Sequence, residues 1–191
     1  MRIPVVGYDP SMRHWGIAEG ILDLESGFLE HLNLSVIEPK GKTHKQVRTN
    51  SIDMTIAQEL YDKVLPTALK AKAIFVEVPV GSQSASGMKS YGMCVGVLGS
   101  LRSNGIQLIE VTASEVKLAL SGKKQASKEQ MVTAGLAHYP GANWPRHAYA
   151  GKTFAKGDLQ ASAEHMADAI GAIHAGVNTP VFQNMLRLLG A

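Results

Sequence analysis

The sequence predicts an α/β fold, in which strands and helices alternate along a chain of 191 residues. Short runs of β-branched residues that end at proline or at a turn are typical of buried strands, and longer segments carry apolar residues at helical spacing. The composition, 45% hydrophobic and 18% charged, is that of an ordinary globular protein. A chain of this length has one core by default, so we expect a single domain over residues 1–191.

The amino-terminal part of the chain predicts an antiparallel meander of three strands. Residues 3–8, IPVVGY, are short and β-branched, and the run stops at Asp9 and Pro10. Segments 14–22 and 28–37 mix polar and apolar residues on either side of a turn that contains glycine, as the two arms of a hairpin do.

The rest of the chain predicts two further strands and five helices. In chain order these are a helix at 52–70, a strand at 73–78, a helix at 87–103, a strand at 106–111, and helices at 114–120, 127–138 and 160–176. Three glycines, Gly92, Gly96 and Gly99, give the second helix a small face that we expect to pack on the sheet. Residues 139–158 contain proline and glycine without periodicity, so we expect a flexible loop there.

Composition also limits the class of protein. No apolar stretch reaches the roughly 18 residues that span a bilayer, and we expect no membrane contact. Cys94 is the only cysteine, which excludes an internal disulfide and a thiolate zinc site and fits a cytoplasmic location, with no secretory signal at the start. The formal net charge is +3, with basic regions at 40–48 and 117–156. Such regions are compatible with nucleic-acid contact but are more often solvated surface.

Asp9 and Glu77 are the strongest candidates for chemistry. Each lies at the end of a buried strand, among apolar residues and shortly before a proline. A carboxylate in that place is costly unless it is paired or binds a metal ion, so two of them suggest a shared cation. Glu164, His165 and Asp168 lie on neighbouring positions of the last helix and can complete the site. Such ligands favour Mg²⁺ or Mn²⁺ and metal-dependent phosphodiester hydrolysis.

Each of these residues also has a purely structural explanation. Asp9 can cap the turn at Pro10, and spacing alone does not separate that role from metal binding. Glu77 is harder to explain in this way, because a charge in a central strand is costly. His165, taken by itself, fits a helix surface as well as a ligand position.

Five segments resemble, in order, the RuvC-type family of Holliday junction resolvases. The family's first-strand motif is similar to VVGYDPSMRHWG, its second acidic strand to IFVEVPV, and its glycine-rich helix to YGMCVGVLGSL. Its lysine-bearing segment resembles VKLALSGKKQASKEQMV, and its carboxyl-terminal helix resembles EHMADAIGAIHAG. Five segments in register over nearly the whole chain are a specific signal. The resemblance implies a ribonuclease H-like fold, with a central mixed five-stranded sheet and helices on both faces.

The resemblance also implies an activity and a set of roles. It implies a homodimeric endonuclease of DNA recombination and repair that nicks two opposed strands of a four-way junction, with one or two Mg²⁺ ions per subunit, or Mn²⁺ in their place. A branch-migration helicase is a candidate partner, and the location would be the nucleoid, in a host cytoplasm if a phage encodes the protein. The implied metal ligands and catalytic residues are Asp9, Glu77, His165 and Asp168, with Lys128 as a further catalytic residue and Lys117, Lys123, Lys124 and Lys128 as DNA contacts.

The chain departs from the family pattern at three places. Ser11 stands where the family usually has glycine, and Pro79 and Val80 stand where many members place an aromatic wedge, for which Tyr91 is a candidate replacement. The loop at 139–158 is longer than usual. It combines aromatic with basic side chains, which suits either stacking on unpaired bases or a plain surface insertion: Trp144, Tyr149 and Phe154 with Arg146, His147, Lys152 and Lys156.

Two other functions remain open from the sequence. One is a junction-binding protein that recruits other enzymes and does not cleave. The other is a broader nuclease that acts on forks, flaps or RNA–DNA hybrids.

Overall fold

The computed structural model describes residues 1–41 and 48–188, so most of the basic region at 40–48 lies outside the described residues. Its centre is one five-stranded sheet in the order β3-β2-β1-β4-β5. The first three strands pair antiparallel, while β4 and β5 continue the sheet in parallel with β1. The strands are β1 (Arg2–Asp9), β2 (Trp15–Asp23), β3 (Leu29–Ile37), β4 (Ala73–Glu77) and β5 (Leu108–Val111). This mixed sheet confirms the predicted fold class.

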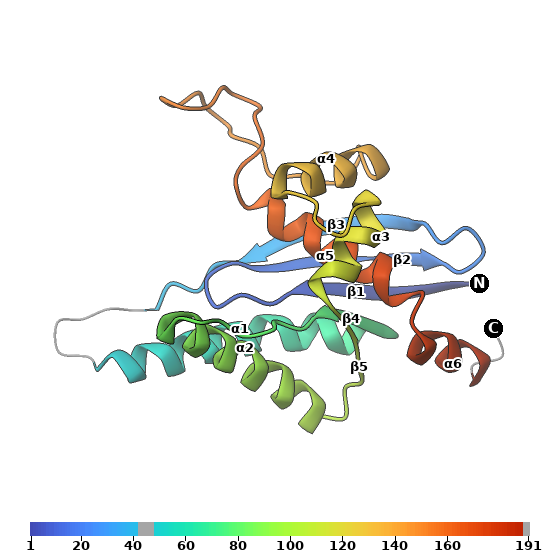
Figure 1. Ribbon diagram of the computed structural model, residues 1–191, viewed down its shortest axis with the longest axis horizontal. Coiled ribbons are helices and arrows are strands. Elements are labelled where there is room, and N and C mark those ends of the chain that lie inside the picture. The colour runs from blue at the N-terminus through green and yellow to red at the C-terminus, as the bar shows by residue number, and fades with distance from the viewer. Residues whose placement is uncertain (42–47, 189–191) are drawn as a thin grey trace.

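Helices cover both faces of the sheet (Figure 1). On one face lie α1 (Thr49–Lys70) and α2 (Ala85–Ser103), and on the other lie α3 (Ala113–Ser121), α4 (Lys128–His138) and α5 (Ala163–Gly176). Among the described residues, none of the helices combines the length and apolar character that a membrane span needs.

A sixth helix, α6 (Pro180–Leu188), was not predicted from the sequence. Thr179 and Pro180 are an amino-terminal signal that could have indicated it, because the Thr179 hydroxyl caps the backbone N–H of Phe182 at 3.3 Å and proline suits the first helical position. The Phe182 ring is buried and packs edge-on against Phe75 of β4, with ring centroids 5.2 Å apart. This contact holds α6 against the core.

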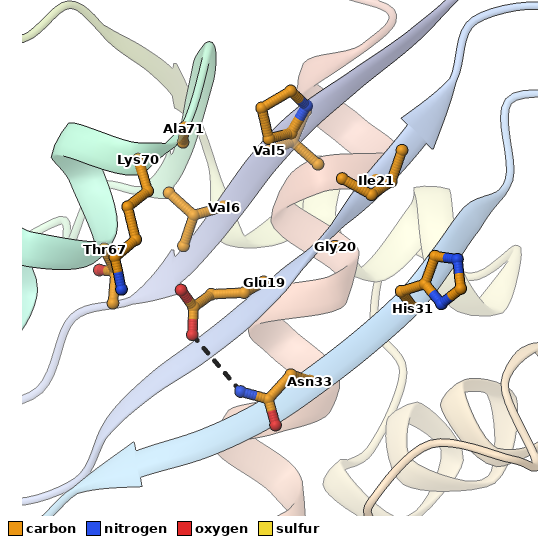
Figure 2. Close-up of a pocket in the computed structure, with 11 residues that line it drawn as sticks. Val5, Val6, Glu19, Gly20, Ile21, His31, Asn33, Thr67, Lys70 and Ala71 are labelled. Carbon is orange, nitrogen blue, oxygen red and sulfur yellow. Dashed lines mark hydrogen bonds between the residues drawn. The ribbon is translucent and has the colours of Figure 1, made fainter.

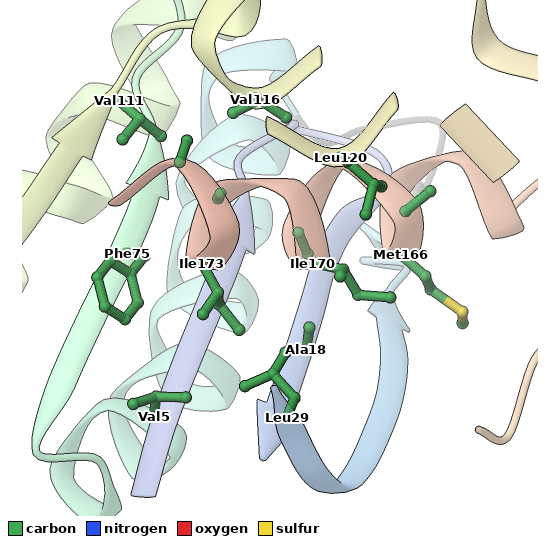
Figure 3. Close-up of a cluster of buried hydrophobic side chains, with 14 of the residues drawn as sticks. Val5, Ala18, Leu29, Phe75, Val111, Val116, Leu120, Met166, Ile170 and Ile173 are labelled. Atoms are coloured by element: carbon green, nitrogen blue, oxygen red, sulfur yellow. The ribbon is translucent and has the colours of Figure 1, made fainter. Parts of the chain in front are cut away.

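Helix α5 lies directly on the sheet, which places its first turn beside the end of β1. Its apolar residues, including Met166, Ile170 and Ile173, point into a cluster with side chains of β1, β2 and β4 (Figure 3). The close approach requires glycine in the strands. A Cβ atom at Gly7 would overlap the Ala169 carbonyl, and one at Gly16 would overlap the His165 carbonyl.

The glycine face of α2 does not pack on the sheet, so that expectation is wrong. Among the described residues, and apart from the chain neighbours and the backbone of the helix itself, no atom lies within 4 Å of the position that a Cβ would take at Gly92, Gly96 or Gly99. The helix instead turns larger residues inward, among them Leu98 and Leu101, because these bury more apolar surface against the sheet. The glycine face is therefore left on the outside of the described structure.

Candidate metal centre

The sheet brings Asp9 and Glu77 to the same edge. Strands β1 and β4 are parallel neighbours, with Tyr8 opposite Val76 in the register. Asp9 and Glu77 are the last residues of these two strands, so both carboxylates lie at the carboxyl ends of the strands. That edge is where open α/β sheets usually place their ligands. The sequence prediction that the two acids converge is consistent with this topology.

His165 from the first turn of α5 joins this edge through a direct contact. Its Nδ1 atom lies 2.7 Å from Oδ2 of Asp9, and the two side chains are 19% and 15% exposed. Burial lowers the pKa of His165, but the hydrogen bond to Asp9 and the charges of Asp9, Glu164 and Asp168 outweigh it, so the pKa is raised. The imidazole beside the carboxylates is therefore protonated more readily than that of an ordinary histidine.

Asp168 lies one turn further along α5 and is partly buried. Burial, together with the charge of Asp9, raises its pKa to about 7, although His165 and Lys117 act in the opposite direction. Its Oδ1 atom is buried and has no hydrogen-bond partner among the residues that the structure describes. Because an unpaired buried carboxylate oxygen is costly, this atom indicates a partner other than the protein.

Glu77 shows the same pattern. Burial, together with the charges of Asp9 and Asp168, raises its pKa to about 8, although Lys117 acts in the opposite direction. The mutual influence of Asp9, Glu77 and Asp168 places the three carboxyl groups in one electrostatic environment that has an excess of negative charge. A divalent cation would relieve that repulsion.

The donor set fits a divalent metal ion. Three carboxylates and one imidazole are the ligand types that Mg²⁺ and Mn²⁺ accept. The unpaired Oδ1 of Asp168 is an oxygen that can bind the ion. Within residues 1–41 and 48–188, however, no three His, Cys, Asp or Glu side chains already stand at the spacing of a metal cluster. Asp9 and His165 are instead bonded to each other. A bound ion would have to replace this hydrogen bond.

Lys128 and Glu164 form an ion pair beside the carboxylates. Lys128 Nζ donates a 2.6 Å hydrogen bond to Glu164 Oε1, and this bond raises the pKa of Lys128. The same Glu164 oxygen lies 3.5 Å from Nε2 of His165. The lysine side chain is 77% exposed, so it can meet a substrate phosphate while it stays near the site. Glu164 thus contacts both Lys128 and His165, which favours a role in holding these two side chains over a role as a metal ligand.

The remaining predicted lysines divide into two groups. The charge of Lys117, on α3, influences both Glu77 and Asp168, so this residue lies near the site. Lys123 and Lys124 are exposed on the connection between α3 and α4. No hydrogen bond or ion pair joins their ammonium groups to another side chain in the part of the chain that the structure describes.

His14 is a neighbour of the site that sequence reasoning did not identify. Its ring stacks on His165, with centroids 5.4 Å apart and planes within 8°. Both rings line a cavity of about 300 Å³. The other residues that line it are Glu38, His147, Gln160, Ala161, Ser162 and Glu164. The only available signal was that His14 closely follows Asp9, because its contact with a helix so far along the chain cannot be read from spacing.

Val80, which stands where an aromatic wedge was expected, lies near Tyr91, the candidate replacement. Val80 is exposed in the connection between β4 and α2, and Tyr91 is partly buried on α2. Both line a cavity of about 430 Å³. Tyr91 is therefore close to the position where an aromatic wedge was expected.

A further cavity is not part of this centre. It has a volume of about 270 Å³ and lies between α1 and the strands β1 to β3, where Glu19 contacts Asn33 (Figure 2). None of the proposed ligands lines it. We therefore assign the chemistry to the strand ends and not to this cavity.

Comparisons with known proteins show which family the chain is similar to. A family model described as crossover junction endodeoxyribonuclease RuvC matches residues 5–137, which include Asp9 and Glu77 but end before α5. A protein of that description from Acidiphilium cryptum is 28% identical over 143 residues, which are 74% of this chain and 81% of the relative. Another, from Cupriavidus pinatubonensis, is 26% identical over 127 residues, 66% of each chain.

Solved structures share the fold. The structure of T. thermophilus RuvC in complex with a Holliday junction substrate has a TM-score of 0.61 and 17% identity, over 97% of this chain and 96% of the other. The Thermus thermophilus RuvC structure has a TM-score of 0.58 and 18% identity, over 98% and 97%. The ribonuclease H-like architecture expected from the sequence is confirmed.

Proposed function

The chain belongs to the crossover junction endodeoxyribonuclease RuvC family, and on this basis we propose that it resolves four-way DNA junctions by nicking two opposed strands. The observation that carries the proposal is the convergence of Asp9, Glu77, Asp168 and His165 at the carboxyl ends of β1 and β4. Three of these groups share one electrostatic environment, and the fourth is bonded to Asp9.

Asp9, Glu77, His165 and Asp168 would hold one or two divalent ions, Mg²⁺ with Mn²⁺ as a substitute. When bound, such ions activate a water molecule and stabilise the negative charge that develops on the phosphate oxygens. The protein contributes the buried setting, in which Glu77 and Asp168 are poorly solvated and so gain more from a cation than exposed carboxylates do. Before an ion binds, Asp9 orients the imidazole of His165 through the 2.7 Å hydrogen bond.

Lys117 and Lys128 neutralise the phosphates next to the bond that is cut. Lys117 is near Glu77 and Asp168, and Lys128 is held by Glu164 at the rim. An ammonium group that meets a phosphate strengthens binding without reading sequence. Lys123 and Lys124 are exposed and would contact the DNA backbone further from the cut.

The active form is proposed to be a homodimer, because two sites related by a twofold axis match two strands of like polarity. The outer face of α2 is a suitable interface. It combines the open glycine positions, such as Gly92 and Gly96, with exposed Met88 and Val95. A branch-migration helicase and a cytoplasmic location stay predictions from the resemblance.

The proposal is tested with an end-labelled synthetic four-way junction in Mg²⁺, beside a Y-shaped fork and a linear duplex. We expect paired, symmetric nicks on the junction only, and none with the Asp168→Asn variant, although that variant still binds. Tight binding without nicks would replace the proposal with a recruitment protein. Equal cutting of the fork would replace it with a broader branch nuclease.

A further inference from the structure

We propose that residues 145–160, which we call the arm, form a platform on which unpaired bases of the DNA stack next to the metal centre. This inference extends the proposed function, because it assigns a strand contact to a segment outside the catalytic set. In Figure 1 the arm projects away from the sheet, beyond α4 and α5. Four observations support the proposal: the bracing of the arm, its aromatic rings, its charge and its place beside the site.

The arm is irregular in secondary structure but is braced across its base. The backbone N–H of His147 donates to the Asp158 carbonyl at 2.8 Å, and the N–H of Gly157 donates back to the His147 carbonyl at 2.9 Å. Arg146 forms an isolated antiparallel bridge with Leu159, and its guanidinium donates to the Gly157 carbonyl at 2.8 Å. Such cross-bracing presents side chains from a preformed scaffold, which lowers the entropy cost of binding.

Trp144, just before the arm, anchors it and does not itself offer a stacking surface. The indole is buried, and its Nε1–H donates to the Tyr139 carbonyl at 2.9 Å. A Cβ atom at Gly135 of α4 would overlap this ring, so the indole fits closely against that helix. The suggestion that Trp144 contributes to base stacking is therefore wrong, because its ring is already covered by protein.

The other two aromatic residues of the arm differ in how much of the ring is exposed. Tyr149 is 83% exposed, and within the described residues its ring has no aromatic neighbour and its hydroxyl no hydrogen-bond partner. Phe154 is 37% exposed and stacks on His147, with ring centroids 3.6 Å apart and planes within 11°. An exposed tyrosine on the same arm as a stacked pair of rings can accept flat aromatic ligands, and nucleobases are the ligands that also match the charge of the arm.

The charge of the arm matches a nucleic-acid strand. Lys152 and Lys156 are exposed and lie on either side of Phe154 in the sequence. The one carboxylate of the arm, that of Asp158, accepts a 2.6 Å hydrogen bond from the Ala155 N–H. Because that acid is occupied inside the arm, the two ammonium groups are left to meet phosphates while the rings meet bases.

The base of the arm also borders the metal centre. His147 and Gln160 line the same cavity of about 300 Å³ as His14, Glu164 and His165. His147 therefore connects the Phe154 ring, on one side, with the cavity beside His165, on the other. A strand whose phosphate lay at the metal centre and which ran along this cavity would lead its neighbouring bases toward the arm.

The test uses junctions and single-stranded oligonucleotides that carry 2-aminopurine next to the cutting position, in EDTA so that no cleavage occurs. Stacking on a ring quenches 2-aminopurine. We expect quenching with the wild-type chain, and weaker quenching with about tenfold weaker binding for Tyr149→Ala. Phe28→Ala is the matched control, because Phe28 is another exposed aromatic residue in the turn between β2 and β3. It should leave both readouts unchanged.

A second pair of variants tests the charge. Lys152→Gln with Lys156→Gln should lower the salt dependence of binding by about two in the log–log slope. Lys63→Gln with Lys70→Gln, on α1, should not change it. Circular dichroism of each variant checks that the fold is retained.

The outcomes separate this inference from the proposed function. If the wild-type chain nicks junctions in Mg²⁺ while Tyr149→Ala and the Lys152 and Lys156 variant bind and quench as the wild type does, the arm inference is overturned and the proposed function stands. If junctions are not cut but Tyr149→Ala abolishes quenching on the single strand, the arm inference stands and the proposed function fails.

Discussion

Helix α5 carries two histidines in opposite chemical environments. At its amino-terminal end His165 contacts Asp9 and has a raised pKa, because the carboxylates outweigh burial. Toward its carboxyl-terminal end His174 lies 2.7 Å from the Tyr139 hydroxyl and close to the ring of His138. Burial, and then the charge of His138, lowers the pKa of His174 to about 4. One helix therefore carries an imidazole with a raised pKa at one end and an imidazole with a lowered pKa at the other.

The difference shows that the surroundings, and not the residue type, assign the role of a histidine. His165 lies at the edge where two parallel strands end in acids. His174 lies where Tyr139 is placed to donate its hydroxyl hydrogen to a neutral imidazole, and where the same hydroxyl oxygen accepts the Leu29 N–H at 3.4 Å. The first environment favours chemistry, and the second stabilises the junction of the hairpin with α4 and α5.

The largest expected difference between the two histidines is in cleavage. His165→Ala removes a proposed metal ligand and the partner of Asp9, and should lower the rate of junction cleavage by about 100-fold, since a metal ion supplies several kcal/mol of stabilisation. His174→Ala should leave the rate per folded molecule unchanged. Single-turnover cleavage in Mg²⁺ measures both. Equal losses in the two variants would contradict the division of roles along α5.

Glu77, at the end of β4 in the proposed metal centre, and His174, on α5, should also give opposite pH dependences of stability in the metal-free protein. Glu77 has an ordinary pKa of 4.5 that is raised to about 8 in the folded protein, so its contribution is complete below pH 4.5 and is lost as the pH rises through 8. His174 has an ordinary pKa of 6.5 that is lowered to about 4, so its contribution is complete above pH 6.5 and is lost as the pH falls through 4.

Each of these changes should amount to on the order of 3 kcal/mol in the free energy of unfolding. Urea unfolding in EDTA from pH 4 to pH 9 measures them. Glu77→Gln should reduce the loss at high pH, of which Asp168 supplies the rest because its pKa is also raised, to about 7, and should leave the loss at low pH in place. Mg²⁺ should restore stability at pH 8 in the wild-type chain and not in Glu77→Gln. A wild-type curve that rises steadily to pH 9 without metal would contradict the assignment of Glu77.

His174→Ala is expected to cost about 2 kcal/mol of folding stability, because it opens a small cavity and removes the acceptor for the Tyr139 hydroxyl. Thermal or urea unfolding at pH 7.5 gives the value. Tyr139→Phe is the matched variant, since it removes the same hydrogen bond and keeps the ring. Its loss should be about half as large, and a larger loss for Tyr139→Phe than for His174→Ala would argue against this explanation.

The smallest effect is expected at the rim of the site. Lys128→Gln should lower the salt dependence of junction binding by about one in the log–log slope and weaken binding equally on all junction sequences. Fluorescence anisotropy between 50 and 200 mM salt measures the slope. Lys63→Gln, on the far helix α1, is the control and should give the wild-type slope.

The order of the elements and two of the ligands could be predicted from local sequence. Strands β1 and β4 are short apolar runs with an acid at the end. That pattern predicts the two strands and also indicates Asp9 and Glu77 as candidate metal ligands. The spacing of Glu164, His165 and Asp168 predicted that they share one region of a helix. Spacing did not predict that Glu164 would form a hydrogen bond with Lys128 while His165 forms one with Asp9.

The remaining features depend on contacts between distant parts of the chain. The stack of His14 on His165 exists because Gly16 lets α5 lie against β2. The sequence predicted only an irregular loop where the arm lies. Hydrogen bonds such as that from His147 to Asp158 join backbone groups, so the periodicity of the side chains does not reveal them. Sequence reasoning also packed the glycines of α2 on the sheet, although larger residues on the other face of the helix bury more apolar surface.

The central claim is that Asp9, Glu77, His165 and Asp168 form one metal centre. The most direct test is an anomalous difference map from crystals of the wild-type chain soaked in Mn²⁺ at a concentration that supports cleavage. The account predicts a peak among these four side chains, and its loss in crystals of the Asp168→Asn variant. A wild-type map with no peak there, or with Mn²⁺ bound only elsewhere, would contradict the account.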